Sequence, residues 1–196
     1  MFNLVRTVGR LPSRPYTVAV FVAFLFAVGA AAQQKSPGAG PILMLETAKG
    51  TIEIETYPEE APKTVARILE LVKKNFYNGL RFHRAEPNFV VQVGDPVTRD
   101  VSRQAWWGRQ GSGKPIGVAE VTKKRRHVVG AVSMAYPGTD RALADSQFFI
   151  MRRAAPEYDG KYTVFGKVLK GQDVVAKIQR GDILKRVYVK DEPAKF

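Results

Sequence analysis

The chain has 196 residues, of which 45% are hydrophobic and 25% are charged, so it is large and apolar enough to bury one sizeable core. It contains no cysteine, which excludes disulfides and thiolate-bound metal sites. Its only two histidines, His83 and His127, lie far apart in sequence, which argues against a histidine-rich metal site. The formal net charge of +13 favours weak attraction to polyanions but carries no information about the fold.

Residues 1–32 have the composition of a secretory signal peptide. Three arginines precede fifteen uncharged apolar residues at 18–32, and the run ends in Ala30-Ala31-Ala32, small residues that suit a cleavage site. A membrane-spanning helix needs about twenty apolar residues, which is more than this run supplies. We therefore predict that the leader is cleaved, with an uncleaved membrane anchor as the alternative.

The rest of the chain divides into a linker, one domain and a tail. Residues 33–41 contain two prolines and two glycines among small and polar residues and predict a flexible linker. No internal repeat or second linker follows, so we predict a single domain at residues 42–190 and a short tail at 191–196. With the leader removed, we expect the domain in the periplasm or another extracytoplasmic space.

The domain shows the patterns of short strands with two helices. Residues 42–47 and 51–57 flank Gly50 and predict a hairpin, because glycine suits the tight position between two strands. Between residues 61 and 74 the apolar positions recur at helical spacing, with Pro62 in the first turn, which predicts a helix. Further strands are predicted at 80–84, 89–93, 128–134, 147–151, 163–169 and 184–189, and a second helix at 174–179.

Eight strands in mostly antiparallel order with two helices predict a mainly β fold. We expect a closed eight-stranded antiparallel β-barrel capped by the two α-helices, with a β-sandwich as the alternative on periodicity alone. Residues 95–126 show no clear element, and long ordered loops in compact domains are often functional. Residues 108–114 match most of a phosphate-binding loop, but Pro115 replaces the required hydroxyl residue, so we interpret these glycines as shaping the loop.

Four blocks of the sequence, in order along the chain, form a specific pattern. The first runs from Tyr77 to Asp95 and includes Phe82-His83-Arg84, and the others lie at 133–135, 146–150 and 159–166. Together they resemble the cyclophilin family of peptidyl-prolyl cis/trans isomerases over almost the whole predicted domain. The resemblance implies a cyclophilin-like barrel that isomerises X–Pro bonds in polypeptide substrates.

The resemblance also implies a role for individual residues. Arg84 is implied as the catalytic arginine, with Gln92 holding it and contacting substrate and Phe89 lining the proline pocket beside it. His83 alternates with its neighbours along the predicted strand, so we expect it to point away from the site and to be structural. The substrate-binding residues implied by the resemblance are Val90 and Phe149 in the proline pocket, Ala135 and Gln147 in the groove for the residues before proline, and Tyr158 and Tyr162.

An arginine suits this reaction for a physical reason. The X–Pro bond has a rotation barrier of about 18–20 kcal/mol, because the nitrogen lone pair is delocalised in the planar amide. The lone pair localises in the twisted transition state and can then accept a hydrogen bond. A fixed guanidinium stabilises that state more than the planar one and stays protonated near neutral pH. We therefore predict that no metal, cofactor or covalent intermediate is needed.

Two other functions stay open at this stage. One is a chaperone or peptide-binding module that holds proline-containing segments without turnover. The other is a surface protein that binds polyanions, and an export signal argues against specific nucleic acid as the polyanion. The basic residues that would make an anionic contact are Lys123, Lys124, Arg125 and Arg126.

The sequence departs from the family pattern near the predicted groove. Ala85, Glu86 and Val93 replace residues that are usually aliphatic, aliphatic and small, and Tyr136 stands where asparagine is common. These departures bear on the shape of the groove more than on the chemistry of Arg84. We therefore expect only weak binding of cyclosporin, and we expect the protein to be a monomer.

Overall fold

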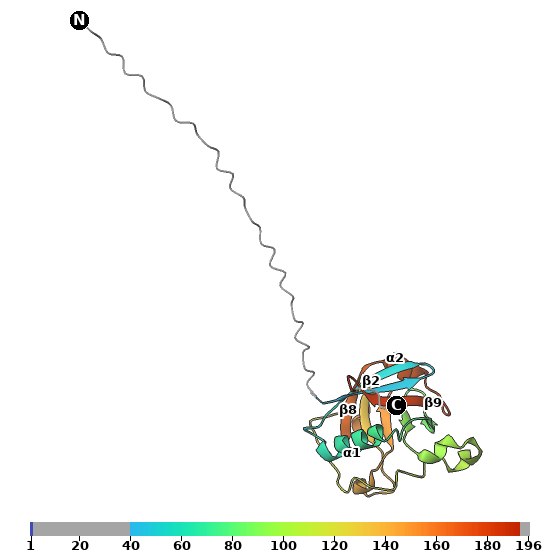
Figure 1. Ribbon diagram of the computed structural model, residues 1–196. Helices are drawn as coiled ribbons and strands as arrows, with labels where there is room; N and C mark the ends of the chain where they lie inside the picture. Colours follow the sequence, from blue (N-terminus) through green and yellow to red (C-terminus); the bar gives the residue numbers. More distant parts are fainter. Residues whose placement is uncertain (2–39, 193–196) are drawn as a thin grey trace. The chain divides into compact units, whose positions relative to one another are not determined.

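The computed structural model describes residue 1 and residues 40–192. Residues 40–192 contain one nine-stranded antiparallel sheet, two α-helices and four short 3₁₀ helices (Figure 1). The predicted leader, most of the predicted linker and the end of the predicted tail lie outside the described residues, so the domain limits and the signal peptide stay predictions. Within the described part of the chain, no helix has both the length and the apolar character that crossing a membrane requires.

The elements follow the predicted order closely. The strands are β1 (Ile42–Thr47), β2 (Gly50–Thr56), β3 (Leu80–Arg81), β4 (Arg84–Ala85), β5 (Val90–Val93), β6 (Ala131–Met134), β7 (Phe148–Met151), β8 (Val164–Lys170) and β9 (Ile183–Val189). The helices are α1 (Pro62–Lys73), α2 (Gln172–Lys177) and the 3₁₀ turns η1 (Pro96–Arg99), η2 (Val101–Trp106), η3 (Arg141–Leu143) and η4 (Pro156–Tyr158). The predicted hairpin and both predicted helices are therefore confirmed.

The sheet curls so that its two ends are neighbouring segments of the chain. The strand order is β3-β9-β1-β2-β8-β6-β7-β5-β4, and only Phe82 and His83 separate β3 from β4. The prediction of one strand at 80–84 is wrong, because the chain bonds to β9 at Leu80 and then crosses to β5 at Arg84. The mainly β fold class is confirmed with nine strands in place of eight. A single sheet holds all nine strands, which rules out the β-sandwich.

Two separate clusters of buried side chains pack against the sheet, one on each face. The larger cluster lies inside the curl and includes Ile54, Ile68 of α1 and Val175 of α2. The two helices lie on opposite sides of the strands and seal this core (Figure 1). Because side chains alternate along a strand, Val90 and Phe149 point the other way and belong to the second cluster, on the outer face.

The long segment after β5 is ordered by buried and charged anchors. Asp95 is fully buried, and its Oδ2 accepts a hydrogen bond from the backbone N–H of Gly108 at 2.6 Å. At the start of α1 the cap residue has no side-chain acceptor, and Glu120 instead accepts from the backbone N–H groups of Lys63 and Thr64 at 3.0 and 2.8 Å. A carboxylate suits this helix end, where backbone donors are unpaired. The loop between β5 and β6 is thus fixed to the domain at both ends.

Gly94, which directly follows β5, is expected to tolerate no side chain. Its φ is +115°, and a Cβ there would meet Ser146 O and lie 2.7 Å from the Cα of Gln147. We expect Gly94→Ala to lower the free energy of unfolding by about 3 kcal/mol or more, measured by urea denaturation. Gly113→Ala is the matched control, because Gly113 also has a positive φ but has open space around its Cα, and it should cost only about 1 kcal/mol. Equal losses in the two variants would contradict the close packing.

Candidate active site

Arg84 and Gln92 face each other across β4 and β5. The two residues are register partners, and Arg84 Nη1 donates to Gln92 Oε1 at 3.3 Å. Arg84 Nε donates to Glu86 Oε1 at 2.7 Å. Burial alone would lower the pKa of Arg84, but the hydrogen bond and charge of Glu86 outweigh it and raise that pKa above its ordinary value. The guanidinium is therefore a permanently charged donor held at two of its edges.

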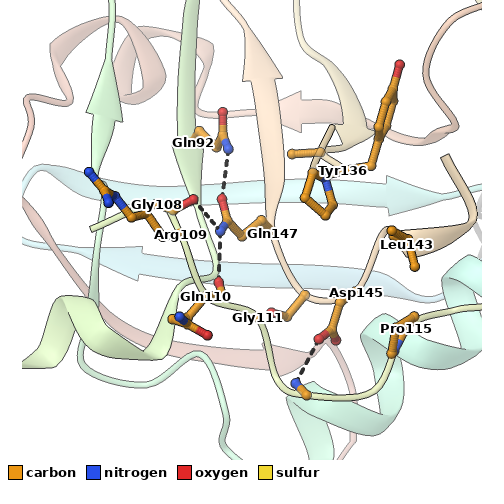
Figure 2. A pocket seen from close by; sticks show the side chains of 14 residues that line it. Gln92, Gly108, Arg109, Gln110, Gly111, Pro115, Tyr136, Leu143, Asp145 and Gln147 are labelled. Atoms are coloured by element: carbon orange, nitrogen blue, oxygen red, sulfur yellow. Dashed lines mark hydrogen bonds between the residues drawn. The ribbon is translucent and has the colours of Figure 1, made fainter. Parts of the chain in front are cut away.

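A chain of side-chain amides continues from Gln92 to the long loop. Gln92 Nε2 donates to Gln147 Oε1 at 2.8 Å, and Gln147 Nε2 donates to the carbonyl oxygens of Gly108 and Gln110 at 3.0 and 2.8 Å (Figure 2). Because two carbonyls take both donors of Gln147, its oxygen must face Gln92. The nitrogen of Gln92 then faces Gln147, which leaves its oxygen for Arg84. Backbone carbonyls of the loop thus set the orientation of the amide that holds Arg84.

Beside Arg84 lies an apolar surface made of aromatic rings. Val90 and Phe149 are buried at its base, and the ring of Phe89 lies 5.7 Å from the guanidinium carbon of Arg84. Tyr158 makes edge contacts with Phe89 and Phe149, with ring centroids 5.5 and 6.0 Å apart. Tyr162 packs against Phe149 at 5.3 Å. The structure therefore brings together all the residues predicted for the proline pocket.

The predicted groove is present as a cavity of about 360 Å³ next to this surface. Ala135 and Gln147, the residues predicted for the groove, both line it. Gln92 lines it as well, beside Gln147 (Figure 2), and also bonds to Arg84. Tyr136 also lines the cavity, and its ring centroid is 5.0 Å from that of Tyr162. A tyrosine at this position therefore forms one wall of the groove and joins it to the aromatic surface.

A buried Ser–His–Asp chain supports the pocket and was not predicted. His127 Nε2 lies 3.0 Å from Ser133 Oγ, its Nδ1 lies 3.0 Å from Asp159 Oδ1, and its ring stacks on Phe149 at 6.2 Å. The arrangement resembles a hydrolase triad, but Ser133 is fully buried and offers no exposed nucleophile. We interpret the chain as a support that fixes the ring of Phe149. Ser133 and Asp159 belong to the family-like blocks, whereas His127 precedes them and gave no signal of its own.

His83 is buried and does not line the cavity, as expected for a structural residue. Its ring packs under Gly108, where a Cβ would lie 2.9 Å from His83 Cδ2. Burial lowers the pKa of His83 to about 4. Burial also lowers the pKa of His127, against the opposing hydrogen bond and charge of Asp159. Both rings are therefore neutral near pH 7.

Part of the basic run is held against the domain. Lys124 and Arg125 both form ion pairs with Glu60 at 2.8 Å, and the Arg125 guanidinium carbon lies 3.7 Å from the centroid of the Tyr57 ring. Glu60 is itself shielded, with 7% of its side chain exposed. Two of the four predicted anionic contacts are thus committed to anchoring the loop.

Comparisons with known proteins agree with one another. The family model described as cyclophilin type peptidyl-prolyl cis-trans isomerase/CLD matches residues 42–195. The chain is 41% identical over 138 residues to peptidyl-prolyl cis-trans isomerase B of Bacillus subtilis, covering 70% of this chain and 90% of that protein. It is 38% identical over 168 residues to a probable peptidyl-prolyl cis-trans isomerase of Brucella abortus, covering 83% of this chain and 85% of that protein.

Solved structures also resemble the fold. The cyclophilin AquaCyp293 from Hirschia baltica superposes with a TM-score of 0.63 at 26% identity, covering 78% of this chain and 75% of that one. A cyclophilin type isomerase of Cryptosporidium parvum, crystallised in the presence of the dipeptide Ala-Pro, gives a TM-score of 0.66 at 21% identity, covering 77% of this chain and 99% of that one. The second likeness bears on the fold alone.

We predict that the protein loses stability in mild acid. In the unfolded chain a histidine has a pKa near 6.5, whereas folded His83 has a pKa of about 4, so below pH 6.5 the unfolded state binds more protons. The free energy of unfolding should fall between pH 7 and pH 5, by about 2 kcal/mol from His83 alone, as measured by urea denaturation. His83→Gln should flatten this pH dependence. A stability that stays constant over this range would contradict the neutral, buried state of the ring.

Proposed function

The chain belongs to the cyclophilin-type peptidyl-prolyl cis/trans isomerases, and we propose that it accelerates proline-limited folding of exported proteins. One observation carries the proposal, which is a doubly held Arg84 beside the apolar surface of Phe89, Val90 and Phe149. The predicted leader supplies the location. The Ala-Pro dipeptide present with the C. parvum relative is in line with proline-containing polypeptides as substrates.

Arg84 has donors left for the substrate. A guanidinium carries five N–H groups, and within the described residues Nε donates to Glu86 and Nη1 to Gln92. The guanidinium also has a hydrogen-bond interaction with Tyr158 at the edge of the pocket. Its remaining N–H groups are left to donate to an amide nitrogen bound next to Phe89. In the planar X–Pro amide that nitrogen is a poor acceptor, and in the twisted amide it accepts. The hydrogen bond thus forms mainly in the transition state, which is the condition for catalysis.

One hydrogen bond does not account for the whole rate. Bringing isomerisation from tens of seconds to milliseconds needs roughly 10⁴-fold, or about 5–6 kcal/mol. A charge-assisted hydrogen bond contributes roughly 1.5–3 kcal/mol. We assign the balance to the aromatic surface, which holds the proline ring and removes water from the amide while the preceding carbonyl rotates. The Ser133–His127–Asp159 chain fixes the Phe149 ring that forms part of this surface.

The other candidate activities are weaker or secondary. A module that holds proline-containing segments without turnover would use the same pocket, but it would not need the oriented guanidinium. Contact with anionic surfaces would rely mainly on Lys123 and Arg126, because Glu60 pairs with the two residues between them. Weak cyclosporin binding and a monomeric state stay predictions.

Arg84→Ala is expected to lower kcat/KM for peptide isomerisation at least tenfold, because it removes the transition-state donor. The measurement is NMR exchange on a proline-containing peptide, with thermal unfolding to show that the variant stays folded. Arg186→Ala is the control, since Arg186 pairs with Glu46 between β1 and β9, outside the pocket, and should leave kcat/KM unchanged. Undiminished turnover in Arg84→Ala would refute the proposed mechanism.

We expect the full-length chain, expressed with its own leader, to be recovered outside the cytoplasm with its mature N-terminus at Gln33. Mass spectrometry of the purified protein identifies the first residue. The physical reason is that the apolar run is too short for a stable span and ends in small residues. Protein that keeps its arginine-containing N-terminus and resists extraction from membranes at alkaline pH would support the anchor instead.

A further inference from the structure

Next to the groove, residues 106–110, which we call the shelf, carry two tryptophans and an arginine outside the family-like blocks. We propose that the shelf is a binding subsite for an acidic side chain located one or two residues before the substrate proline. The isomerase would then select acidic segments over basic ones. This inference rests on the proposed function, because it assumes that the groove takes the residues before proline.

The groove has one charge that is already satisfied. Among the described residues that line it, only Arg109 and Asp145 carry formal charges. The carboxylate of Asp145 accepts from Ser112 Oγ and from the backbone N–H groups of Gly113 and Lys114 at 2.8 and 3.2 Å. Arg67 Nη2 lies 3.6 Å from the same carboxylate. Asp145 is therefore engaged by four partners, one of them the cationic Arg67, and has little hydrogen-bonding capacity left for a substrate.

Arg109 is the groove charge that a substrate can use. Its side chain is exposed, and within residues 40–192 no carboxylate lies at ion-pair distance from it. Its guanidinium carbon lies 4.9 Å from the centroid of the Trp106 ring, which holds the side chain over an aromatic face. Figure 2 shows Arg109 beside Gly108, on the far side of the groove from Asp145. The groove thus presents a cation at the end that adjoins Gln92.

The backbone of the shelf is fixed before any substrate binds. The fully buried Asp95 accepts from the backbone N–H groups of Gly108, Arg109 and Gln110 through one carboxylate oxygen. The carbonyls on either side of Arg109 accept from Gln147, which leads through Gln92 to Arg84. A carboxylate bound here would lose little entropy to ordering of the protein.

A comparison of Arg84 with Arg109 also supports an acidic substrate residue at the shelf. Arg84 is paired with Glu86, so its field is partly cancelled, whereas Arg109 has no such partner in the described part of the chain. An acidic side chain before proline would gain a favourable Coulomb interaction there, and a basic one would be repelled. This interaction is exposed to solvent, so salt should weaken it.

Trp106 completes the subsite and makes it observable. The residue is 55% exposed and offers an apolar face to the methylene groups of a glutamate. Trp107 is held in place, because its Nε1 donates to the carbonyl of Asp100 at 3.1 Å and Arg180 lies 5.6 Å from its ring. These are the only two tryptophans in the sequence. Tryptophan fluorescence, excited selectively over the seven tyrosines, therefore reports on the shelf.

The test compares matched peptides that differ only in the charge before proline. We would measure kcat/KM by NMR exchange for Ala-Glu-Pro-Phe and Glu-Ala-Pro-Phe against their lysine counterparts at low salt. We expect the better glutamate peptide to exceed its lysine counterpart at least fivefold, and the ratio to shrink at 0.5 M NaCl. Arg109→Gln should bring the ratio close to one, and Arg109→Glu should invert it. Lys185→Gln, on the exposed side of β9, is the charge-matched control and should keep the ratio.

Two results would overturn the subsite. One is equal kcat/KM for glutamate and lysine peptides in the unaltered protein, and the other is a preference that survives Arg109→Gln. Binding is followed separately by the change in tryptophan fluorescence on titration with each peptide, using Arg84→Ala. Tighter binding of the glutamate peptide without turnover in the unaltered protein would uphold the subsite while rejecting the isomerase proposal. Turnover without charge preference would do the reverse.

Discussion

The geometry of the site depends on the side-chain amide of Gln147. Its nitrogen is taken by two backbone carbonyls of the long loop, so its oxygen faces Gln92. That single constraint decides which end of Gln92 meets Arg84, since an amide turned the other way would place a donor against a donor. Arg84 is thus oriented by a loop more than twenty residues away in sequence. The loop in turn is held by the buried carboxylate of Asp95.

The curl of the sheet makes this arrangement possible. Phe82 is fully buried and occupies the short crossing between β3 and β4, and its backbone bonds to the turn before β9. The crossing moves the chain from one edge of the sheet to the other within two residues. Arg84 therefore emerges opposite Gln92, on the face that carries Phe149, while the two helices seal the opposite core. The crossing between β3 and β4 therefore both curls the sheet and positions Arg84 in the site.

Much of the fold could be predicted from the sequence, because apolar residues recur at regular spacing along its strands and helices. The hairpin after residue 42 and α1 show clear patterns, and both form as predicted. The division of residues 80–84 into β3 and β4 could not be predicted, because a buried Phe82 fits one continuous strand equally well. The pocket residues came from the resemblance, and the structure places them together. The Gln147 contacts with the loop carbonyls could not be predicted, because every residue has a backbone carbonyl and the sequence does not indicate which ones act as acceptors.

The shelf was not predicted because its sequence has no periodic pattern. Residues 95–126 lack periodicity, so nothing in the sequence indicates which of their side chains meet the groove. Their positions follow from Asp95 and Asp145, two carboxylates whose partners are mostly backbone N–H groups. Glycines at 108, 111 and 113 resembled a phosphate loop, but here Gly108 makes room for the ring of His83. The chemistry of the loop is set by the groups it packs against.

Glu86 forms an ion pair with Arg84 that fixes the orientation of its guanidinium. It stands where an aliphatic residue is usual, and it takes the Nε edge of the guanidinium at 2.7 Å. The pair is partly exposed, with 38% and 47% of the two side chains accessible, so solvent screens much of its Coulomb energy. Its main effect is therefore orientation, because Nε and Nη1 are both held while the guanidinium also meets Tyr158 at the pocket. An arginine so held loses little entropy when the amide twists, and this favours the transition state over the planar substrate.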